Sequence, residues 1–439
     1  MEITGSSVES KCPDATNPAQ LTGTARLSVV MVTALITFFQ QGLLFYALPL
    51  YFSAKGLPSS AWETWGLYLI IAWLFAPLVN WILARHIGER RIWALGLVFD
   101  ALIIAWLIVL PVGLLGADFA VGVAALLYGV AGALLWISVM TLVQNVPAVR
   151  RGRSNSLLMI SLGLGSIAGP LFGRWTLAIQ GNLGHTSLAG FYVMLSAGVI
   201  LSLLGGVIIY LWGEYPRDIQ KPIVTSSAPT LRDDFRLARS ASFLALVIPL
   251  SLLTGPTFQA TNVYLAYRAA EPGIGLIQNS QDHGWMALQV TSYVMQLLGG
   301  LLLGCVAGKR VSFRVAAALL GAFGFCGIGI GLAPDAIVLF ICVALFEMGR
   351  QFARWLQTGY VSEHVSAEQR SAAISVSVLL SGVGATGFML LLRVVQSPDA
   401  SSFSSALPFL IAGVFSAVGV LILVVGGRLT AKAKSMPER

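Results

Sequence analysis

The sequence is poor in charge, in histidine and in cysteine. Only 10% of its 439 residues are charged and 56% are hydrophobic, and the mean hydropathy is +0.81. A soluble domain carries about a quarter charged residues, so this composition excludes an ordinary soluble protein. The four cysteines and four histidines show neither metal-site spacing nor a disulfide framework. We therefore expect no metal and no other cofactor.

Motifs for chemistry on phosphates are missing as well. The sequence has no Gly-x-x-x-x-Gly-Lys-Ser/Thr stretch, which would cradle the phosphates of ATP. It also shows no nucleophile cluster of the kind that a membrane-embedded enzyme would need. We expect the chain not to be an enzyme.

The sequence has, instead, many long apolar runs. A helix needs about 20 apolar residues to cross a bilayer, and twelve runs reach that length. They are too long for the strands of a membrane barrel, whose apolar residues alternate over about ten positions. The sequence thus predicts an all-α membrane protein whose twelve spans lie near residues 28–53, 62–84, 92–113, 119–144, 156–178, 188–213, 242–266, 285–307, 313–333, 336–360, 371–395 and 404–427.

The basic residues gather on one side of these spans. Of the 27 lysines and arginines, 21 lie in the two end segments and the loops that share their side, four lie on the other side, and Arg350 and Arg354 lie within a span. Loops rich in Lys and Arg stay in the cytoplasm. We therefore expect both termini to be cytoplasmic, in a cytoplasmic (inner) membrane. The same bias explains the net charge of +8, so the expected partner is the lipid bilayer and not a nucleic acid.

One charged stretch near the centre divides the spans into two sets of six. The expected divisions are a cytoplasmic N-terminal tail, an N-terminal bundle, a cytoplasmic linker, a C-terminal bundle and a cytoplasmic tail, at residues 1–27, 28–213, 214–241, 242–427 and 428–439. The halves align faintly, since Arg153 and Gly165 match Arg370 and Gly382 at a constant offset of 217. Parallel six-span halves are a known transporter plan, with the substrate site between them near mid-membrane.

The fifth span carries glycines at intervals of four residues. Gly165, Gly169 and Gly173 share one helix face beside Pro170, and such a face lets another backbone approach closely. The stretch resembles the antiporter motif (motif C) of the major facilitator superfamily and occurs in the expected span. Together with the repeat, the resemblance covers essentially the whole chain. It implies that family's fold of two parallel six-helix halves, and in the family the motif is associated with export by antiport.

Two other landmarks of the family are altered. The loop after the second span keeps Leu83 and Gly88 but has Arg85 at a position that is acidic in the family. The fourth-span arginine that the family links to proton handling in many exporters is replaced by Tyr128. Arg85 argues against the family's usual charge lock between spans at the cytoplasmic face, and the missing arginine supports uptake as the alternative to export.

Three charged residues share one face of the tenth span. Glu347, Arg350 and Arg354 fall within about 60° of arc on a helix. Charges in mid-membrane are costly unless they are paired or face a cavity. Either the three residues brace the helices as a self-neutralised cluster, or Arg350 and Arg354 bind substrate while Glu347 carries the transported proton. Their net positive charge slightly favours an anionic substrate.

Polar residues in three other spans complete the predicted site. In this superfamily the first and seventh spans line the central cavity. We expect substrate contacts from six of their side chains, those of Gln40, Gln41, Tyr46, Thr257, Gln259 and Asn262. Hydrogen bonds to the backbone inside the bundle are the alternative role for these groups. Asp100 in the third span is either a structural partner for the basic loops or a second proton-coupling residue.

The sequence therefore predicts a monomeric secondary transporter that works by alternating access. The antiporter motif favours proton-coupled export of a small organic compound. The alternative is proton-coupled uptake of a small metabolite (a nucleoside, sugar or organic anion), with protons or another ion as the coupling partner. A membrane sensor that transports nothing is a third hypothesis, weakened because the chain has no large soluble addition.

Overall fold

A computed structural model shows the chain as a bundle of long helices. It describes residues 18–58, 60–144, 148–183, 187–213, 249–250, 254–257, 260–277, 283–306, 313–365, 370–395 and 405–434. Within these ranges the regular structure is entirely helical. The prediction of an all-α protein is confirmed, whereas the expected linker, residues 214–241, lies outside the described residues.

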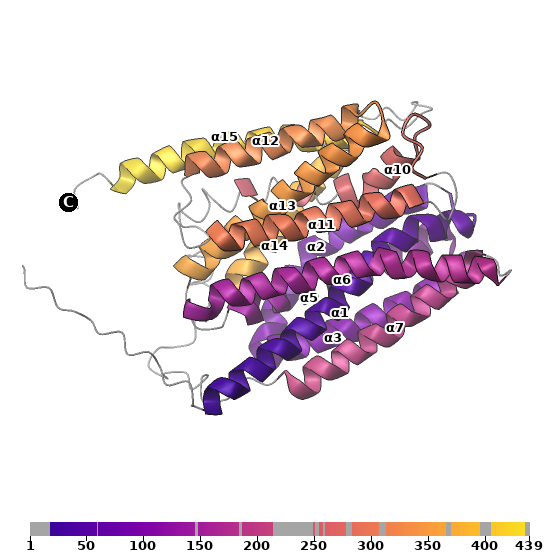
Figure 1. Cartoon of the computed structure of the whole chain (residues 1–439), viewed down its shortest axis with the longest axis horizontal. Helices are drawn as coiled ribbons and strands as arrows, with labels where there is room; N and C mark the ends of the chain where they lie inside the picture. The colour runs from indigo at the N-terminus through magenta and orange to yellow at the C-terminus, as the bar shows by residue number, and fades with distance from the viewer. Residues whose placement is uncertain are drawn as a thin grey trace, which may run out of the picture.

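Six long helices and one short turn make the N-terminal half (Figure 1). They are α1 (Pro18–Ala54), α2 (Ser60–Ile87), α3 (Glu89–Val109), the turn α4 (Val112–Leu115), α5 (Ala117–Gln144), α6 (Ala148–Asn182) and α7 (Ser187–Trp212). All six long helices have the length and apolar composition needed to cross a membrane.

The C-terminal half contains a π-helix and several long α-helices. Its elements are η2 (Ala260–Tyr264), α10 (Leu265–Ala270), α11 (His283–Val306), α12 (Phe313–Leu332), α13 (Ala336–His364), α14 (Arg370–Val395) and α15 (Leu407–Lys434). Short helical segments at 249–250 and 254–257 precede η2. Among the described residues, α14 and α15 also meet the length and composition for a membrane span.

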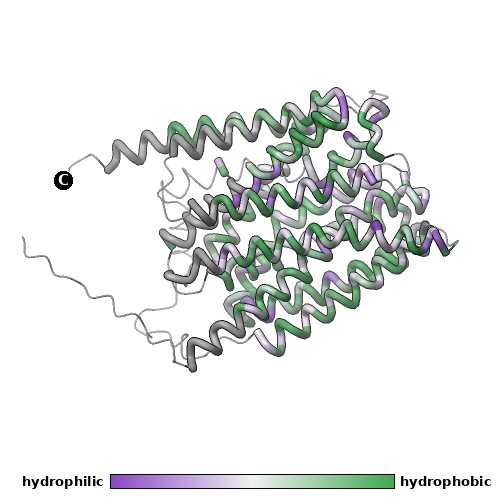
Figure 2. Tube along the Cα trace, viewed as in Figure 1, coloured by the Kyte–Doolittle hydropathy of each residue, from purple (hydrophilic) through white to green (hydrophobic). Residues whose placement is uncertain are grey.

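The long helices run side by side along the long axis of the molecule. α1 begins and α15 ends at the same end of the bundle, on the left of Figure 1. We call this the terminal end and the opposite one the distal end. Apolar residues cover most of the helix lengths in Figure 2. Large apolar side chains such as those of Phe75, Ile200 and Phe325 are 58%, 65% and 72% exposed, which a surface facing lipid tolerates and a soluble surface rarely does.

The internal repeat is visible as the same helix crossing in both halves. In the first half, a Cβ atom added at Gly42 of α1 would lie 2.5 Å from the carbonyl oxygen of Ser166 on α6. In the second half, a Cβ atom at Gly255 would meet the carbonyl oxygen of Ser381 on α14. A glycine thus allows close backbone approach at each crossing, and the halves share this packing as well as their spacing.

The glycines of the fifth span lie on the face of α6 that packs against α1. A Cβ atom at Gly165 would lie 2.5 Å from the carbonyl oxygen of Leu35, and one at Gly169 would strike the backbone of Phe39. A Cβ atom at Gly173 would likewise lie 2.8 Å from a ring carbon of Tyr46. The glycine face therefore serves close packing of two helices, as its spacing indicates.

We expect Gly169→Ala to lower the melting temperature of the purified protein, because the added methyl group must push α6 away from α1. Overpacking of this kind costs about 1–3 kcal/mol of unfolding free energy. Gly387→Ala on α14 is the matched control, since its nearest neighbour would be a Phe415 ring atom at 4.0 Å. Equal melting temperatures for the two variants would contradict the packing role.

Candidate functional site

A cavity lies between the two halves of the bundle. About 940 Å³ of space, its open mouth included, is free of protein atoms. Its lining comes from α1, α2, α3, α5 and α6 of the first half and from η2, α11 and α13 of the second. The wall is mainly apolar and aromatic, with a few amides, two guanidinium groups and one carboxyl group.

A buried ion pair on α13 forms one side of the site. Arg350 Nη2 lies 2.5 Å from Glu347 Oε2, as their i,i+3 spacing predicts. Gln296 Nε2 of α11 donates to the same carboxylate oxygen at 2.9 Å. Arg350 Nη1 donates to Thr261 Oγ1 of the π-helix at 3.1 Å. Glu347 and Arg350 are only 0% and 7% exposed, so neighbouring elements fix their geometry.

Arg354 reaches from α13 across to the first half. Its guanidinium carbon lies 5.1 Å from the centre of the Trp136 ring on α5, within the range of a cation–π interaction. Gln351 makes a second contact between halves, with its Nε2 atom 2.8 Å from Met159 Sδ on α6. The helix that carries the arginines therefore touches both bundles.

Asp100 forms the other charged part of the site. This α3 carboxyl is 3% exposed, and its Oδ2 atom accepts a hydrogen bond from Gln40 Nε2 of α1. Ser202 of α7 lies within hydrogen-bonding reach of both groups, 3.4 Å from Asp100 Oδ2. Asp100 Oδ1 has no hydrogen-bond partner among the described residues. The carboxyl thus bonds to neutral side chains and not to a basic loop within the part of the chain that the structure describes.

The two halves touch at the terminal end of the cavity. Asn80 of α2 donates from Nδ2 to the hydroxyl groups of Ser371 and Ser375 on α14, each at 3.5 Å. Glu89, at the start of α3, accepts from Ser371 and also from Ser138 of α5, the latter at 2.9 Å. Polar contacts therefore join the first half to the start of α14.

The halves also touch at the distal end. Trp62 Nε1 of α2 donates to the carbonyl oxygen of Val263 at 2.5 Å. Trp285 Nε1 of α11 donates to the carbonyl oxygen of Tyr46 at 3.2 Å. Hydrogen bonds between the two halves therefore lie at both ends of the cavity.

A sequence comparison decides the family. The sequence model of the Major Facilitator Superfamily matches residues 30–389. The chain belongs to the major facilitator superfamily. Its fold is therefore the one predicted, twelve transmembrane helices in two parallel six-helix halves. No curated protein sequence is significantly similar to this chain.

Solved structures of other members of the superfamily have similar folds. The E. coli fucose:proton symporter FucP is 15% identical with a TM-score of 0.64, covering 93% of this chain and 99% of its own. The proton:xylose symporter XylE is 15% identical with a TM-score of 0.67, and the match covers 92% of this chain and 95% of XylE. The nucleoside transporter NupG is 15% identical with a TM-score of 0.63, and the match covers 91% of this chain and 98% of NupG. At this identity the likeness concerns the fold alone.

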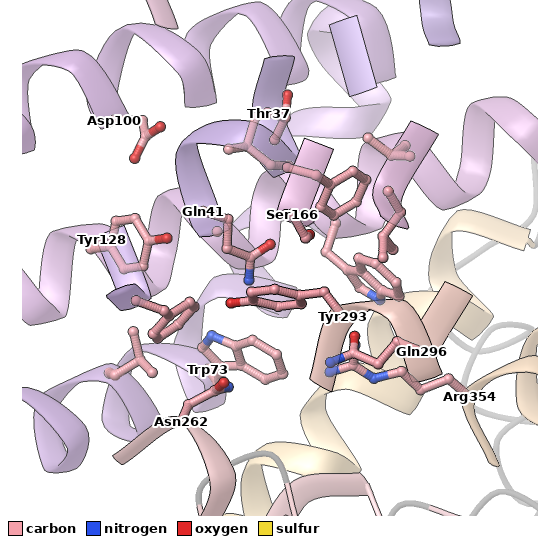
Figure 3. Close-up of a pocket in the computed structure, with 18 of the residues that line it drawn as sticks. Thr37, Gln41, Trp73, Asp100, Tyr128, Ser166, Asn262, Tyr293, Gln296 and Arg354 are labelled. Carbon is pink, nitrogen blue, oxygen red and sulfur yellow. The ribbon is translucent and has the colours of Figure 1, made fainter. Parts of the chain in front are cut away.

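In this superfamily member, five of the ten predicted substrate-binding and proton-coupling residues line the cavity. They are Gln41, Asp100, Asn262, Arg350 and Arg354. Figure 3 shows Asp100 and Arg354 at opposite sides of the cavity, with Gln41 between them. The Asn262 amide nitrogen is buried and has no hydrogen-bond partner among the described residues, so it can donate to a ligand.

Other predicted residues lie behind the wall. Glu347 is buried behind Arg350, and Gln40 bonds to Asp100 and is not part of the lining. Thr257 Oγ1 donates to the carbonyl oxygen of Thr254 at 3.2 Å, the backbone role considered for these groups. Tyr46 is fully buried against α6. Gln259 lies outside the described residues.

The sequence reasoning missed the contribution of the eighth span. Tyr293 and Gln296 of α11 line the cavity, as do Trp73 of α2 and Trp136 of α5. A signal was present for Gln296, because Gln289, Ser292 and Gln296 form a polar stripe at i, i+3 and i+7 on an apolar helix. The tryptophans had no such signal, since an aromatic residue in a span packs equally well against lipid.

We expect Glu347→Gln to destabilise the protein strongly. Removing one partner of a buried ion pair costs about 3–5 kcal/mol, because the other charge stays behind. The measurement is the melting temperature of the purified protein in detergent. Glu347→Leu combined with Arg350→Met removes both charges and should recover much of the loss. A single variant as stable as the parent would show that the pair is not a structural element.

Proposed function

We propose that the chain is a proton-coupled secondary transporter of a small organic compound, working by alternating access. The observation that carries this proposal is Asp100, a buried carboxyl on the wall of the cavity between the halves. Both termini would be cytoplasmic and the membrane a cytoplasmic one, because the basic residues gather on that side. The chain would act as a monomer.

Asp100 suits reversible protonation better than Glu347 does. Asp100 and Glu347 each have one buried carboxylate oxygen without a hydrogen bond among the described residues. Within that part of the chain, however, no cation balances an ionised Asp100, and an unpaired buried charge is costly. A proton on this group removes that cost. Glu347 already has a guanidinium group at 2.5 Å that balances its charge. We therefore assign the transported proton to Asp100, and to Glu347 the task of orienting Arg350.

Uptake is the direction we favour. The similar folds of FucP and XylE belong to proteins described as proton symporters. The glycine face of α6, which resembles the antiporter motif, is explained by its packing against α1. Export by proton antiport remains the second candidate, and it rests on that motif.

The contacts at the two ends of the cavity would open in turn. Rocking of one half against the other exposes a central site first to one side and then to the other. The Asn80–Ser371 contact would have to break when the cavity opens at the terminal end. The Trp285–Tyr46 contact would have to break when it opens at the distal end. The other hydrogen bonds between the halves at each end would break with them, and hydrogen bonds that are exchanged for others cost little net free energy.

We expect Asp100→Asn to separate exchange from accumulation. The test uses proteoliposomes with an imposed pH gradient and labelled fucose, xylose, uridine and phenylacetate. Asparagine cannot release a proton, so gradient-driven accumulation should fall to the equilibrium level while exchange of substrate across the membrane continues. Asp118→Asn is the matched control at an exposed site. Accumulation that survives in Asp100→Asn would overturn the assignment of the proton to Asp100. If the parent protein moves none of the four compounds, the proposal that the chain is a transporter is overturned.

We expect a cross-link between α2 and α14 to stop transport reversibly. Cysteines at Asn80 and Ser371, in a background without the natural cysteines, would be joined by a short cleavable thiol reagent. The cross-link holds the terminal end closed, so flux should fall to the level of empty vesicles and recover after cleavage. The two single-cysteine variants serve as controls. Unchanged flux in the cross-linked protein would contradict alternating access at this end.

A further inference from the structure

The charges around the cavity are balanced but separated. Arg350 and Arg354 line one side, with Glu347 paired to Arg350 behind the wall. Asp100 lies across the cavity, as Figure 3 shows for Asp100 and Arg354. Two carboxyl groups and two guanidinium groups thus leave no net charge while Asp100 is ionised.

The arginine side is built for a planar anion. Arg350 is held by Glu347 and Thr261, and Arg354 lies over the Trp136 ring. The guanidinium group of Arg354 presents a fork of donors, which matches a carboxylate in two parallel hydrogen bonds. Arg350, whose two terminal nitrogens already contact Glu347 and Thr261, adds positive charge beside it. The Asn262 amide nitrogen, buried without a partner among the described residues, adds a neutral donor to the cavity wall.

The space between the charged sides suits an apolar body. Trp73, Phe45 and Leu69 line the cavity, and Tyr293 adds a ring with a hydroxyl group. Small-molecule sites commonly combine such an apolar lining with a few placed polar groups that fix orientation. A compound with a ring or short chain ending in a carboxylate matches this arrangement.

Charge balance links the anion to a proton. If an anion enters while Asp100 is ionised, the cavity acquires a net negative charge in the middle of the membrane, which is costly. If Asp100 is protonated first, the cavity has a net positive charge that the anion neutralises. Each event therefore favours the other, as thermodynamic linkage requires. The groups facing Asp100 are Gln40 of α1, Ser202 of α7 and Tyr128 of α5, and none of them is a cation.

We propose that the cavity binds a monoanionic organic carboxylate at Arg354 and Arg350, together with one proton on Asp100. This inference rests on the proposed function and names its substrate class. One anion would cross with one proton, so the transport cycle would move no net charge.

Binding to the purified full-length protein tests the substrate class. Four probes share one ring and differ in charge: phenylacetate, phenylacetamide, 2-phenylethylamine and zwitterionic L-phenylalanine. We expect phenylacetate to bind at least about tenfold more tightly than the other three, measured by titration calorimetry. We also expect its affinity to be at least about tenfold higher at about pH 6 than at about pH 8, because the bound anion requires the proton.

Variants assign the two ends of the site. In Asp100→Asn, phenylacetate should bind with the low-pH affinity of the parent at both pH values. In Arg354→Gln, its affinity should fall at least about tenfold, while Arg91→Gln at an exposed position of α3 is the matched control. If Arg354→Gln does not fold, the Asp100→Asn titration still decides the proton linkage.

Each other outcome overturns the inference. Equal binding of phenylacetamide would mark a neutral substrate, and tightest binding of L-phenylalanine would mean that Asp100 takes an ammonium group. Affinity that does not change with pH would remove the proton linkage, and binding of none of the probes would remove the carboxylate site. Proton-driven flux of fucose, xylose or uridine would then leave the proposed function standing. Conversely, proton-linked binding of phenylacetate without any flux in proteoliposomes would keep the site and reject transport.

Discussion

The ion pair between Glu347 and Arg350 fixes the orientation of α13, and the rest of the site depends on that orientation. A charge in the middle of a membrane needs a partner, a hydrogen-bond network or a hydrated cavity. Here Gln296 of α11 donates to the paired oxygen of Glu347, and Thr261 of the π-helix accepts from Arg350 Nη1. Because three elements converge on it, α13 is fixed in rotation, and Arg354, one turn further along, is directed towards the first half.

The two halves share a scaffold but not a chemistry. Glycines permit the same close crossing in both, at Gly42 with Ser166 and at Gly255 with Ser381. The repeat offset places Val130 and Ala133 at the positions that correspond to Glu347 and Arg350, so the first half has no counterpart of the ion pair. Its charge is Asp100, on a different helix. A symmetric framework thus holds an asymmetric cavity, with cations on one wall and an acid on the other.

The partners of Asp100 cannot be predicted from the sequence around it. Gln40 and Ser202 are 60 and 102 residues away from Asp100 in the chain. The sequence alone favours a basic cytoplasmic loop as the partner of Asp100. The helix packing instead brings α1 and α7 against α3, and their amide and hydroxyl groups reach the carboxyl first. The same packing turns Gln40 away from the cavity while its neighbour Gln41 faces it.

Hydrophobicity and helical periodicity made the all-α fold, the duplicated plan and the Glu347–Arg350 pair predictable from the sequence. These features are predictable because lipid imposes span length, and residues three or four apart on a helix must be neighbours. Which of the polar residues share one cavity was decided only by the tertiary structure. Rotation of each helix about its axis depends on packing against other helices, and that rotation placed Tyr293, Trp73 and Trp136 in the wall and left Tyr46 and Gln40 behind it.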